Sequence, residues 1–340
     1  MKKHKICKIL LVILAIFLCV AFYELLGICV AYKKQPEVSN TTKKETKNGS
    51  WNECSENTER AVIIEKNPEA LLQRVRLIKN AKKEIILSTF AFQSDESGKL
   101  ILGALHDAAD RGVHIRLLVD GMESWIDMEG NPYFYGLSSH ENVEIKLYNK
   151  ANPLKPWKMM GRMHDKYLIA DGKRYILGGR NTYNYFLGDF PGHKNYDRDV
   201  LVVCDEPEKE NSVNQLSEYF ETIWNQEDSG YFHNNKKLAN RKSVKNAVLE
   251  LQNSYQKYFE ENKERICETD YTDETFETEK ITLVSNPIHT GSKEPVVWYQ
   301  LGELMKNAKN RVKIHTPYII CNDMMYNTWE EIAENVSDFS

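Results

Sequence analysis

The stretch from Met163 to Asn181 reads MHDKYLIADGKRYILGGRN and determines how the rest of the chain is interpreted. Its apolar run Leu168–Ala170 has the composition of a buried strand. The pair Asp171-Gly172 favours a tight hairpin turn, and the residues RYILGG form the return strand. The stretch therefore predicts a β-hairpin that carries several polar side chains.

Two of these polar side chains share a face of the predicted strand. Alternate side chains of a strand project to the same side, so His164 and Lys166 point together, away from Met163, Asp165 and Tyr167. A neutral imidazole can attack phosphorus and form a covalent phosphohistidine. A neighbouring ammonium can neutralise the non-bridging oxygens of the transition state. The pair is therefore typical of phosphoryl-transfer chemistry, although a His and a Lys alone would also fit a solvated strand.

The return strand ends in a Gly-Gly-Arg-Asn sequence that completes the predicted site. Gly178 and Gly179 allow the backbone to approach another part of the molecule closely. Asn181 supplies an amide that can bind phosphate oxygens. The seven cysteines show neither metal-ligand nor redox-motif spacing, so we expect no metal site, no disulfide framework and no cofactor.

The segments on both sides of the hairpin alternate between strand and helix patterns. Strands are predicted at 84–92, 113–121, 143–149 and 199–204, and helices at 68–81, 99–110 and 212–224. Strands that alternate with helices are typical of an α/β domain with a largely parallel sheet.

The sequence HDKYLIAD, followed by GGRN, resembles the HxKxxxxD and GGxN signature of the phospholipase D superfamily. The upstream ADRGVHIRLLVDG and the downstream DRDVLVV and LSEYFETIWN are similar to bacterial cardiolipin synthases. The resemblance extends over about Ala61–Trp224 and resumes near Val296. It implies a phospholipase D-type α/β fold, with a mixed, largely parallel sheet flanked by helices.

The resemblance also implies roles for the residues of the signature. His164 would be the nucleophile or its acid/base counterpart, and Lys166 and Asn181 would bind the phosphate. Asp171 would be mainly structural or orienting.

In relatives an acid on a later strand orients the histidine. That position falls on Asp199 here, with Asp197 as the competing residue. Family members use two facing signatures, in which one histidine is phosphorylated and the other serves as acid and base. One signature occurs in these 340 residues. We therefore expect the second half of the site from a missing C-terminal region, which we favour, or from a homodimer.

The N-terminus has the pattern of a membrane anchor. Lysines precede an apolar run of 24 residues, Ile9–Tyr32, in which Glu24 is the single charge. A bilayer core takes about 20 apolar residues in a helix. Ile28 stands where a cleavable signal would need a small residue. Residues 1–32 therefore predict an uncleaved single-pass helix in a bacterial cell membrane. Lysines flank both ends, which leaves both orientations open, and the compact basic start favours a catalytic body outside.

Composition divides the rest of the chain. We predict a polar linker at 33–59, a first phospholipase D-like domain at 60–226, a charged connector at 227–280 and an incomplete second phospholipase D-like domain at 281–340. The second domain is inferred from a repeat, since LMKNAKNRVKIHTPYI from Leu304 matches the register of LIKNAKKEIILSTFAF from Leu77.

These features predict a membrane-anchored phosphatidyltransferase. It would make cardiolipin from phosphatidylglycerol, or from phosphatidylethanolamine plus phosphatidylglycerol, through a phosphohistidine. The alternatives are a hydrolase with the same site, either a phospholipase or a nuclease, and a truncated chain that is inactive alone. The formal net charge of −4 disfavours a nucleic-acid partner, which usually binds a basic face. The expected partners are phospholipid substrates, the membrane and a second signature.

Overall fold

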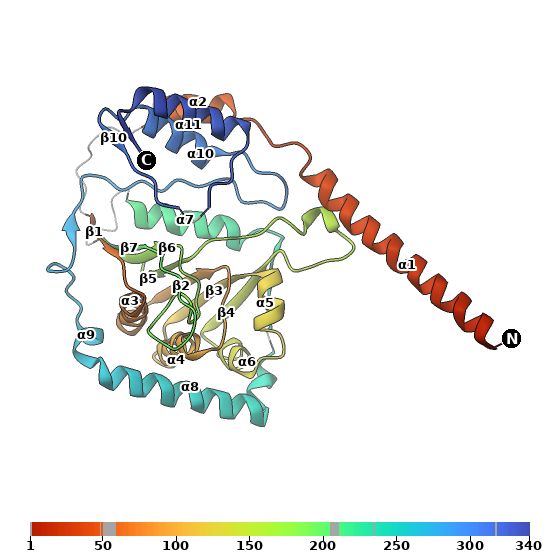
Figure 1. Cartoon of the computed structure of the whole chain (residues 1–340). Coiled ribbons are helices and arrows are strands. Elements are labelled where there is room, and N and C mark those ends of the chain that lie inside the picture. The colour runs from red at the N-terminus through yellow and green to blue at the C-terminus, as the bar shows by residue number, and fades with distance from the viewer. Residues whose placement is uncertain (1, 48, 50–58, 205–210, 234, 317) are drawn as a thin grey trace.

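The computed structural model describes residues 2–47, 49, 59–204, 211–233, 235–316 and 318–340. Within these residues, nine strands form one mixed sheet in the order β8-β4-β3-β2-β5-β6-β7-β1-β9 (Figure 1). The strands are β1 (Glu59–Ile64), β2 (Glu84–Thr89), β3 (His114–Asp120), β4 (Val143–Tyr148), β5 (Tyr167–Ala170), β6 (Arg174–Gly178), β7 (Asp199–Cys204), β8 (Ser229–Tyr231) and β9 (Phe276–Glu277). The strands predicted outside the hairpin all occur in this sheet.

The sheet is mixed as predicted, but the prediction that it is largely parallel is wrong. The pairs β2–β3 and β3–β4 are parallel. The other neighbouring pairs of the described sheet are antiparallel. A parallel pair needs a long crossover, and α4 (Glu96–Asp110), α5 (Gly121–Asp127) and α6 (Pro132–Ser138) supply these crossovers. The alternation of helix and strand ends at the hairpin, and so does the parallel part of the sheet.

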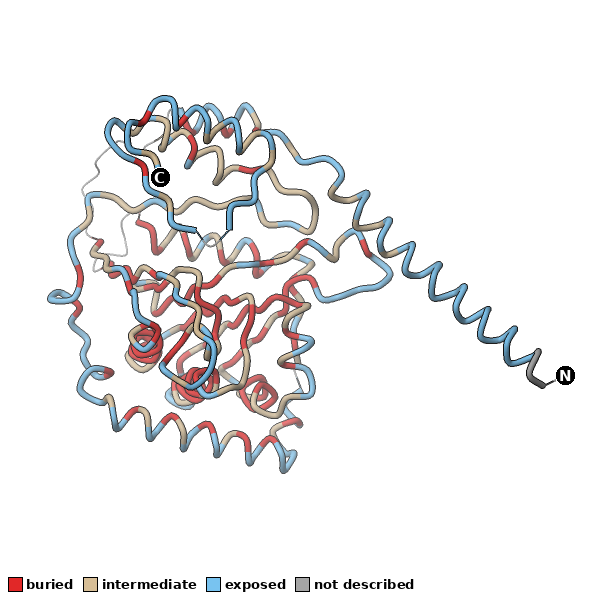
Figure 2. Tube along the Cα trace, viewed as in Figure 1, coloured by how far each residue is buried: buried red, intermediate tan, exposed pale blue. Residues whose placement is uncertain are grey.

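Helices cover both faces of the sheet (Figure 1). The remaining helices of this body are α3 (Asn67–Asn80), α7 (Ser212–Trp224), α8 (Lys242–Glu261), α9 (Lys263–Cys267) and the 3-10 helices η2 (Pro156–Lys158) and η3 (Lys236–Asn240). α3, α4 and α6 lie on one face, and Figure 2 shows α3 and α4 buried along most of their length. α7 covers the opposite face. Successive side chains of β2 point to opposite faces of the sheet. Leu87 packs in the hydrophobic core on the α3 side, and Ile86 packs in a second core on the α7 side.

Residues 227–280 belong to this body and are not a mere connector. β8 pairs with β4 and β9 pairs with β1, so both extend the sheet at its edges. α8 is amphipathic, and its residues Val244, Leu251 and Tyr255 are buried in the same core as α4. Charged residues occupy the exposed face of α8 and much of the rest of the segment, so composition alone did not indicate its structural role.

At the N-terminus, α1 (Lys2–Ala31) contains a stretch, Lys5–Ala31, that is long and apolar enough to cross a membrane. Figure 2 shows α1 exposed along most of its length. By length and composition this is the predicted anchor helix, and its orientation stays a prediction.

The predicted polar linker at 33–59 contains a helix, α2 (Asn40–Lys47). The start of α2 is held by Glu294, whose Oε1 accepts hydrogen bonds from Ser39 N at 2.8 Å and Thr42 Oγ1 at 2.7 Å. Residues 48 and 50–58 of the linker, with Cys54, lie outside the described residues.

Residues 296–340 form a small unit of α10 (Val296–Lys306), β10 (Arg311–Val312), α11 (Asp323–Asn335) and β11 (Asp338–Phe339). β10 begins at Arg311 and β2 begins at Glu84, an offset of 311 − 84 = 227 residues. The same offset separates the repeated sequences, since 304 − 77 = 227. β10 has two residues where β2 has six, because its paired partner is the short β11. The second domain stays a prediction.

Candidate active site

The predicted hairpin occupies the middle of the sheet, where β5 pairs with β2 on one side and with β6 on the other. His164 and Lys166 precede β5 and do not lie within it. Because β5 runs antiparallel to β2, with Tyr167 opposite Ser88, both side chains emerge beside the C-terminal end of β2.

Phe90, the first residue after β2, holds these two side chains on one face. The centroid of the Phe90 ring lies 4.6 Å from that of the His164 imidazole, in an edge-on arrangement. Lys166 Nζ lies 5.4 Å from the Phe90 centroid and donates a hydrogen bond to the carbonyl oxygen of His164 at 2.7 Å. The structure therefore brings His164 and Lys166 together.

The surroundings of the pair shift both pKa values downward. Partial burial, and then the charge of Lys166, lower the pKa of the His164 imidazole. Burial lowers the pKa of Lys166 to about 8, against the opposing charges of Asp165 and Asp197. The lowered pKa of His164 favours the unprotonated imidazole at neutral pH, and a pKa of about 8 leaves most of the Lys166 ammonium charged. This is the combination that a nucleophile beside a phosphate ligand requires.

Asn181 reaches the same end of β2 through the backbone. Its Oδ1 accepts a hydrogen bond from Ala91 N at 3.2 Å, next to Phe90 in the chain. Among the described residues, no hydrogen bond joins Asn181 to His164 or Lys166. Its phosphate-binding role stays a prediction.

Asp171 lies at the opposite end of β5 from the histidine. Its φ of 55° falls in the left-handed region that the hairpin turn needs. Its carboxylate accepts hydrogen bonds from the backbone N–H groups of Lys82 at 2.9 Å, Lys83 at 2.7 Å and Glu84 at 3.0 Å. The carboxylate thus joins the turn to the start of β2, a geometry that fits the structural role implied by the family.

The structure does not support Asp199 as the acid that orients the histidine. Asp199 is buried, and its Oδ2 lies 2.9 Å from Arg74 Nη1 and 3.2 Å from Arg180 Nη1. These arginines come from α3 and from the GGRN sequence, so their approach to β7 could not be read from strand patterns. Of the two candidate acids, Asp197 is the one whose charge, after that of Asp165, raises the pKa of Lys166 against the effect of burial. No hydrogen bond from either carboxylate to the His164 ring occurs in the described part of the chain.

The two glycines of GGRN allow the hairpin to approach the start of β7. A Cβ atom on Gly178 would collide with the Asp199 carboxylate, and one on Gly179 would collide with the Asp197 carboxylate. The close approach predicted from these glycines is therefore to the two aspartates.

Sequence analysis missed Asp120, the last residue of β3. It is fully buried, and its Oδ2 accepts a hydrogen bond from Met163 N at 3.1 Å. It also forms an ion pair with Arg162. Asp120 therefore fixes the backbone directly before His164. The sequence LLVDG contained an indication of this role, because a charged residue ends a buried strand there.

A pocket of about 370 Å³ opens beside the pair, between the hairpin, α7 and residues 283–297, and is lined by His164 and Lys166 among others. On its α7 side, Tyr219 Oη donates a hydrogen bond to Asp165 Oδ2 at 2.8 Å. Lys293 also lines it and donates to the carbonyl oxygen of Arg162 at 3.2 Å. Burial lowers the pKa of Lys293. The pocket thus contains two lysines in addition to the histidine.

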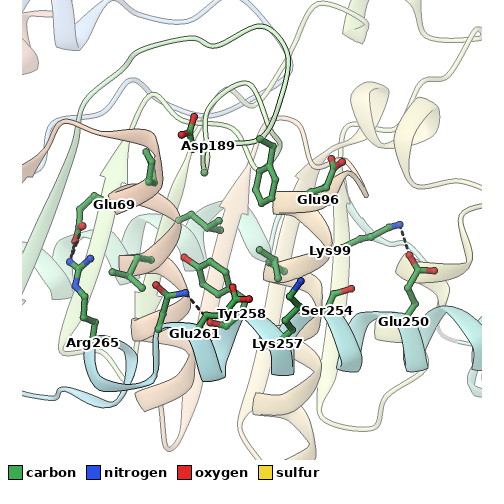
Figure 3. Close-up of a pocket in the computed structure, with 17 residues that line it drawn as sticks. Glu69, Glu96, Lys99, Asp189, Glu250, Ser254, Lys257, Tyr258, Glu261 and Arg265 are labelled. Atoms are coloured by element: carbon green, nitrogen blue, oxygen red, sulfur yellow. Dashed lines mark hydrogen bonds and ion pairs between the residues drawn. The ribbon is translucent and has the colours of Figure 1, made fainter.

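A larger cavity of about 620 Å³ lies away from this chemistry, between α3, α4 and α8 (Figure 3). Ion pairs at its edge join Glu69 to Arg265 at 2.8 Å and Lys99 to Glu250 at 2.6 Å. None of the predicted site residues lines it. Size alone therefore does not identify the reactive site.

Comparisons with known proteins find similarity over the region that contains the hairpin. Residues 74–224 match the family described as "Cardiolipin synthase, PLD-like domain". Cardiolipin synthase C of Escherichia coli is 30% identical over 154 residues, which cover 41% of this chain and 31% of that protein. Cardiolipin synthase 1 of Staphylococcus aureus is 34% identical over 117 residues, which cover 34% of this chain and 23% of that protein. The solved structure of NucT from Helicobacter pylori has 17% identity and a TM-score of 0.41, covering 51% of this chain and 99% of that one.

The chain spans less than two fifths of the length of the curated relatives that it matches first. The matched region contains β2 to β7, the Phe90 contact and the full HxKxxxxD and GGxN signature. Residues 74–224 thus form a PLD-like domain similar to that of cardiolipin synthases.

Proposed function

We propose that this chain supplies the nucleophilic half-site of a membrane-anchored phosphatidyltransferase that makes cardiolipin. The observation that carries the proposal is that His164 and Lys166 both contact the ring of Phe90 and are joined by the hydrogen bond from Lys166 Nζ to the carbonyl oxygen of His164. The similarity to cardiolipin synthases favours a phospholipid substrate over other phosphodiesters, and so does the apolar helix α1.

In the proposed reaction, a ring nitrogen of His164 attacks the phosphorus of phosphatidylglycerol. A phosphorus–nitrogen bond forms, and the bond from phosphorus to the headgroup glycerol breaks. The leaving oxygen takes a proton from the histidine of a second signature. A hydroxyl of a second phosphatidylglycerol, deprotonated by that same histidine, then attacks the phosphorus. The phosphorus–nitrogen bond breaks, and cardiolipin leaves.

Lys166 would stabilise the negative charge that develops on the non-bridging oxygens in both steps. Its partly buried position strengthens this interaction, because fewer water molecules compete for the ammonium. Asn181 would be a second ligand of the same oxygens, and Lys293, which lines the same pocket, would add positive charge. The second histidine would come from further sequence or from a second copy of the chain.

The test is covalent labelling of His164. Membranes that contain the chain are incubated with phosphatidylglycerol radiolabelled at phosphorus, and acid-labile label is mapped to peptides. We expect label on the wild-type chain and none on His164→Ala. His233→Ala is the matched control, because His233 is paired with Glu129 at 3.1 Å far from the hairpin, and it should label normally. Labelling of His164→Ala at the wild-type level would contradict the proposal.

The products separate the proposed transferase from its alternatives. Release of phosphatidic acid as the main product, with no cardiolipin even when a second signature is supplied, would indicate a phospholipase. Cleavage of single-stranded DNA by a chain that leaves phosphatidylglycerol intact would indicate a nuclease.

A further inference from the structure

Large apolar side chains are exposed on the side of the body from which α1 leaves. Leu154, Trp157 and Met160, in the loop before β5, are 78%, 46% and 55% exposed. Trp125 and Ile126, on α5, are 69% and 70% exposed. Single exposed apolar residues are ordinary, whereas a group on one side of a protein marks an interaction site.

The loop of residues 150–161 packs directly against the C-terminal third of α1. Tyr23 Oη donates a hydrogen bond to the carbonyl oxygen of Leu154 at 3.1 Å. Gly27 lies so close to Pro156 that a Cβ atom would collide with the proline ring. The loop is therefore next to the point where α1 would leave a bilayer.

α5 adjoins the same loop. It begins at Gly121, and a Cβ atom there would lie 2.7 Å from the backbone nitrogen of Lys150. Figure 1 shows α5 on the side of the body from which α1 extends. The exposed apolar residues of α5 and of the loop therefore belong to two adjoining elements on this side of the body.

The charge of the loop differs from that of the chain as a whole. The loop 150–161 contains three lysines and no acidic residue, although the chain has a net charge of −4. Lys158 is paired with Asp228 at 2.7 Å, whereas Lys150 and Lys155 are exposed. Tryptophan favours the boundary between lipid and water, and nearby lysines are attracted to anionic headgroups.

We propose that the 150–161 loop and α5 form a membrane-contact surface, in which Leu154, Trp157, Met160, Trp125 and Ile126 enter the interface of an anionic bilayer. The proposal rests on the proposed function in one respect, because it requires α1 to span that bilayer. The proposed insertion would also determine where the site lies relative to the membrane. The loop continues into Met163, whose backbone Asp120 holds, so insertion of the loop would place His164 at the level of the lipid phosphates.

The test measures contact with lipid tails and needs no catalysis. The full chain is reconstituted in vesicles of phosphatidylcholine and phosphatidylglycerol with brominated acyl chains, which quench tryptophan fluorescence. We expect Trp157→Phe and Trp125→Phe each to remove part of the fluorescence that bromine quenches. Trp329→Phe is the matched control, because Trp329 stacks on Trp298 within the α10–α11 unit, and it should leave the quenched amount unchanged.

The results test the membrane-contact surface independently of the proposed function. Equal quenched amounts in wild type, Trp157→Phe and Trp125→Phe would overturn the surface, whatever the activity. The fluorescence of His164→Ala should be quenched as in wild type, because contact with lipid does not depend on catalysis. Quenching of a wild-type chain whose His164 takes no label would support the membrane-contact surface and contradict the transferase. Stronger quenching of Trp157 in vesicles with phosphatidylglycerol than in phosphatidylcholine alone is expected from Lys150 and Lys155. Equal quenching in the two vesicles would overturn the assignment to anionic lipid.

Discussion

The two side chains beside Phe90 need opposite protonation states at the same pH. His164 attacks only when unprotonated, so the labelling rate should fall as the pH drops through its pKa, which lies below the ordinary value of about 6.5. Lys166 binds phosphate when protonated, so the rate should also fall above pH 8, near its pKa of about 8. A plot of the rate constant for labelling against pH should therefore be bell-shaped.

Lys166→Arg is the variant that identifies the alkaline limb. A guanidinium stays charged throughout the accessible pH range, so the alkaline limb should disappear or move to higher pH. An alkaline limb that stays near pH 8 in Lys166→Arg would show that another group titrates there.

A second residue-scale prediction concerns Asp199. Its carboxylate neutralises Arg74 and Arg180 inside the body, so Asp199→Ala leaves two buried charges without their anion. Removing one partner of a buried pair costs about 3–5 kcal/mol. Urea unfolding in detergent should show this loss. Arg198→Ala, which breaks the exposed pair with Glu65 at 2.9 Å, should cost about 1 kcal/mol or less. If Asp199→Ala unfolds like wild type but fails to label, Asp199 acts on the chemistry instead.

At the scale of elements, the β5–β6 turn is stabilised by the carboxylate of Asp171. Asp171→Ala removes the acceptor of three backbone N–H groups and places alanine at a φ of 55°. These N–H groups are exposed or partly buried, so each lost hydrogen bond should cost about 0.5–1.5 kcal/mol, and urea unfolding should show the loss. Asp171→Asn should cost less, because asparagine tolerates positive φ and retains an acceptor oxygen. A folded Asp171→Asn that labels no better than His164→Ala would instead give Asp171 a chemical role.

Elements with strong local patterns could be predicted from the sequence, and those defined by distant partners could not. α7 occupies 212–224 as predicted, because its apolar spacing alone defines it. The antiparallel direction of β7 and β1 depends on which strands meet, which no local pattern states. The pairing of His164 with Lys166 was predicted from strand alternation, although both residues lie just before β5 in the structure. The contacts of Phe90, Asp120 and Arg180 bring together residues that are far apart in the chain, and they became visible only in the fold.

At the scale of the whole molecule, the presence of one signature predicts that the chain carries out only the first step of the reaction. These 340 residues carry one HxKxxxxD signature, and the two-step mechanism needs a nucleophile and a separate acid/base. We therefore expect the purified chain in phosphatidylglycerol vesicles to accept at most one phosphatidyl group per His164 and to release little cardiolipin. Free imidazole, added as a diffusible acid and base, should restore turnover to the wild-type chain.

His164→Ala should gain no cardiolipin synthesis from imidazole, because its nucleophile is missing, and this variant is the control for the rescue. The alternative is a site shared by two copies of the chain. It predicts that activity depends differently on the fraction of wild-type chains in the vesicles. If wild-type chains are diluted with His164→Ala chains in the same vesicles, a site that needs two intact histidines loses activity with the square of the wild-type fraction. A site complete within one chain loses activity in direct proportion. Strong cardiolipin synthesis without imidazole, together with the squared dependence, would establish the dimer and refute the half-site.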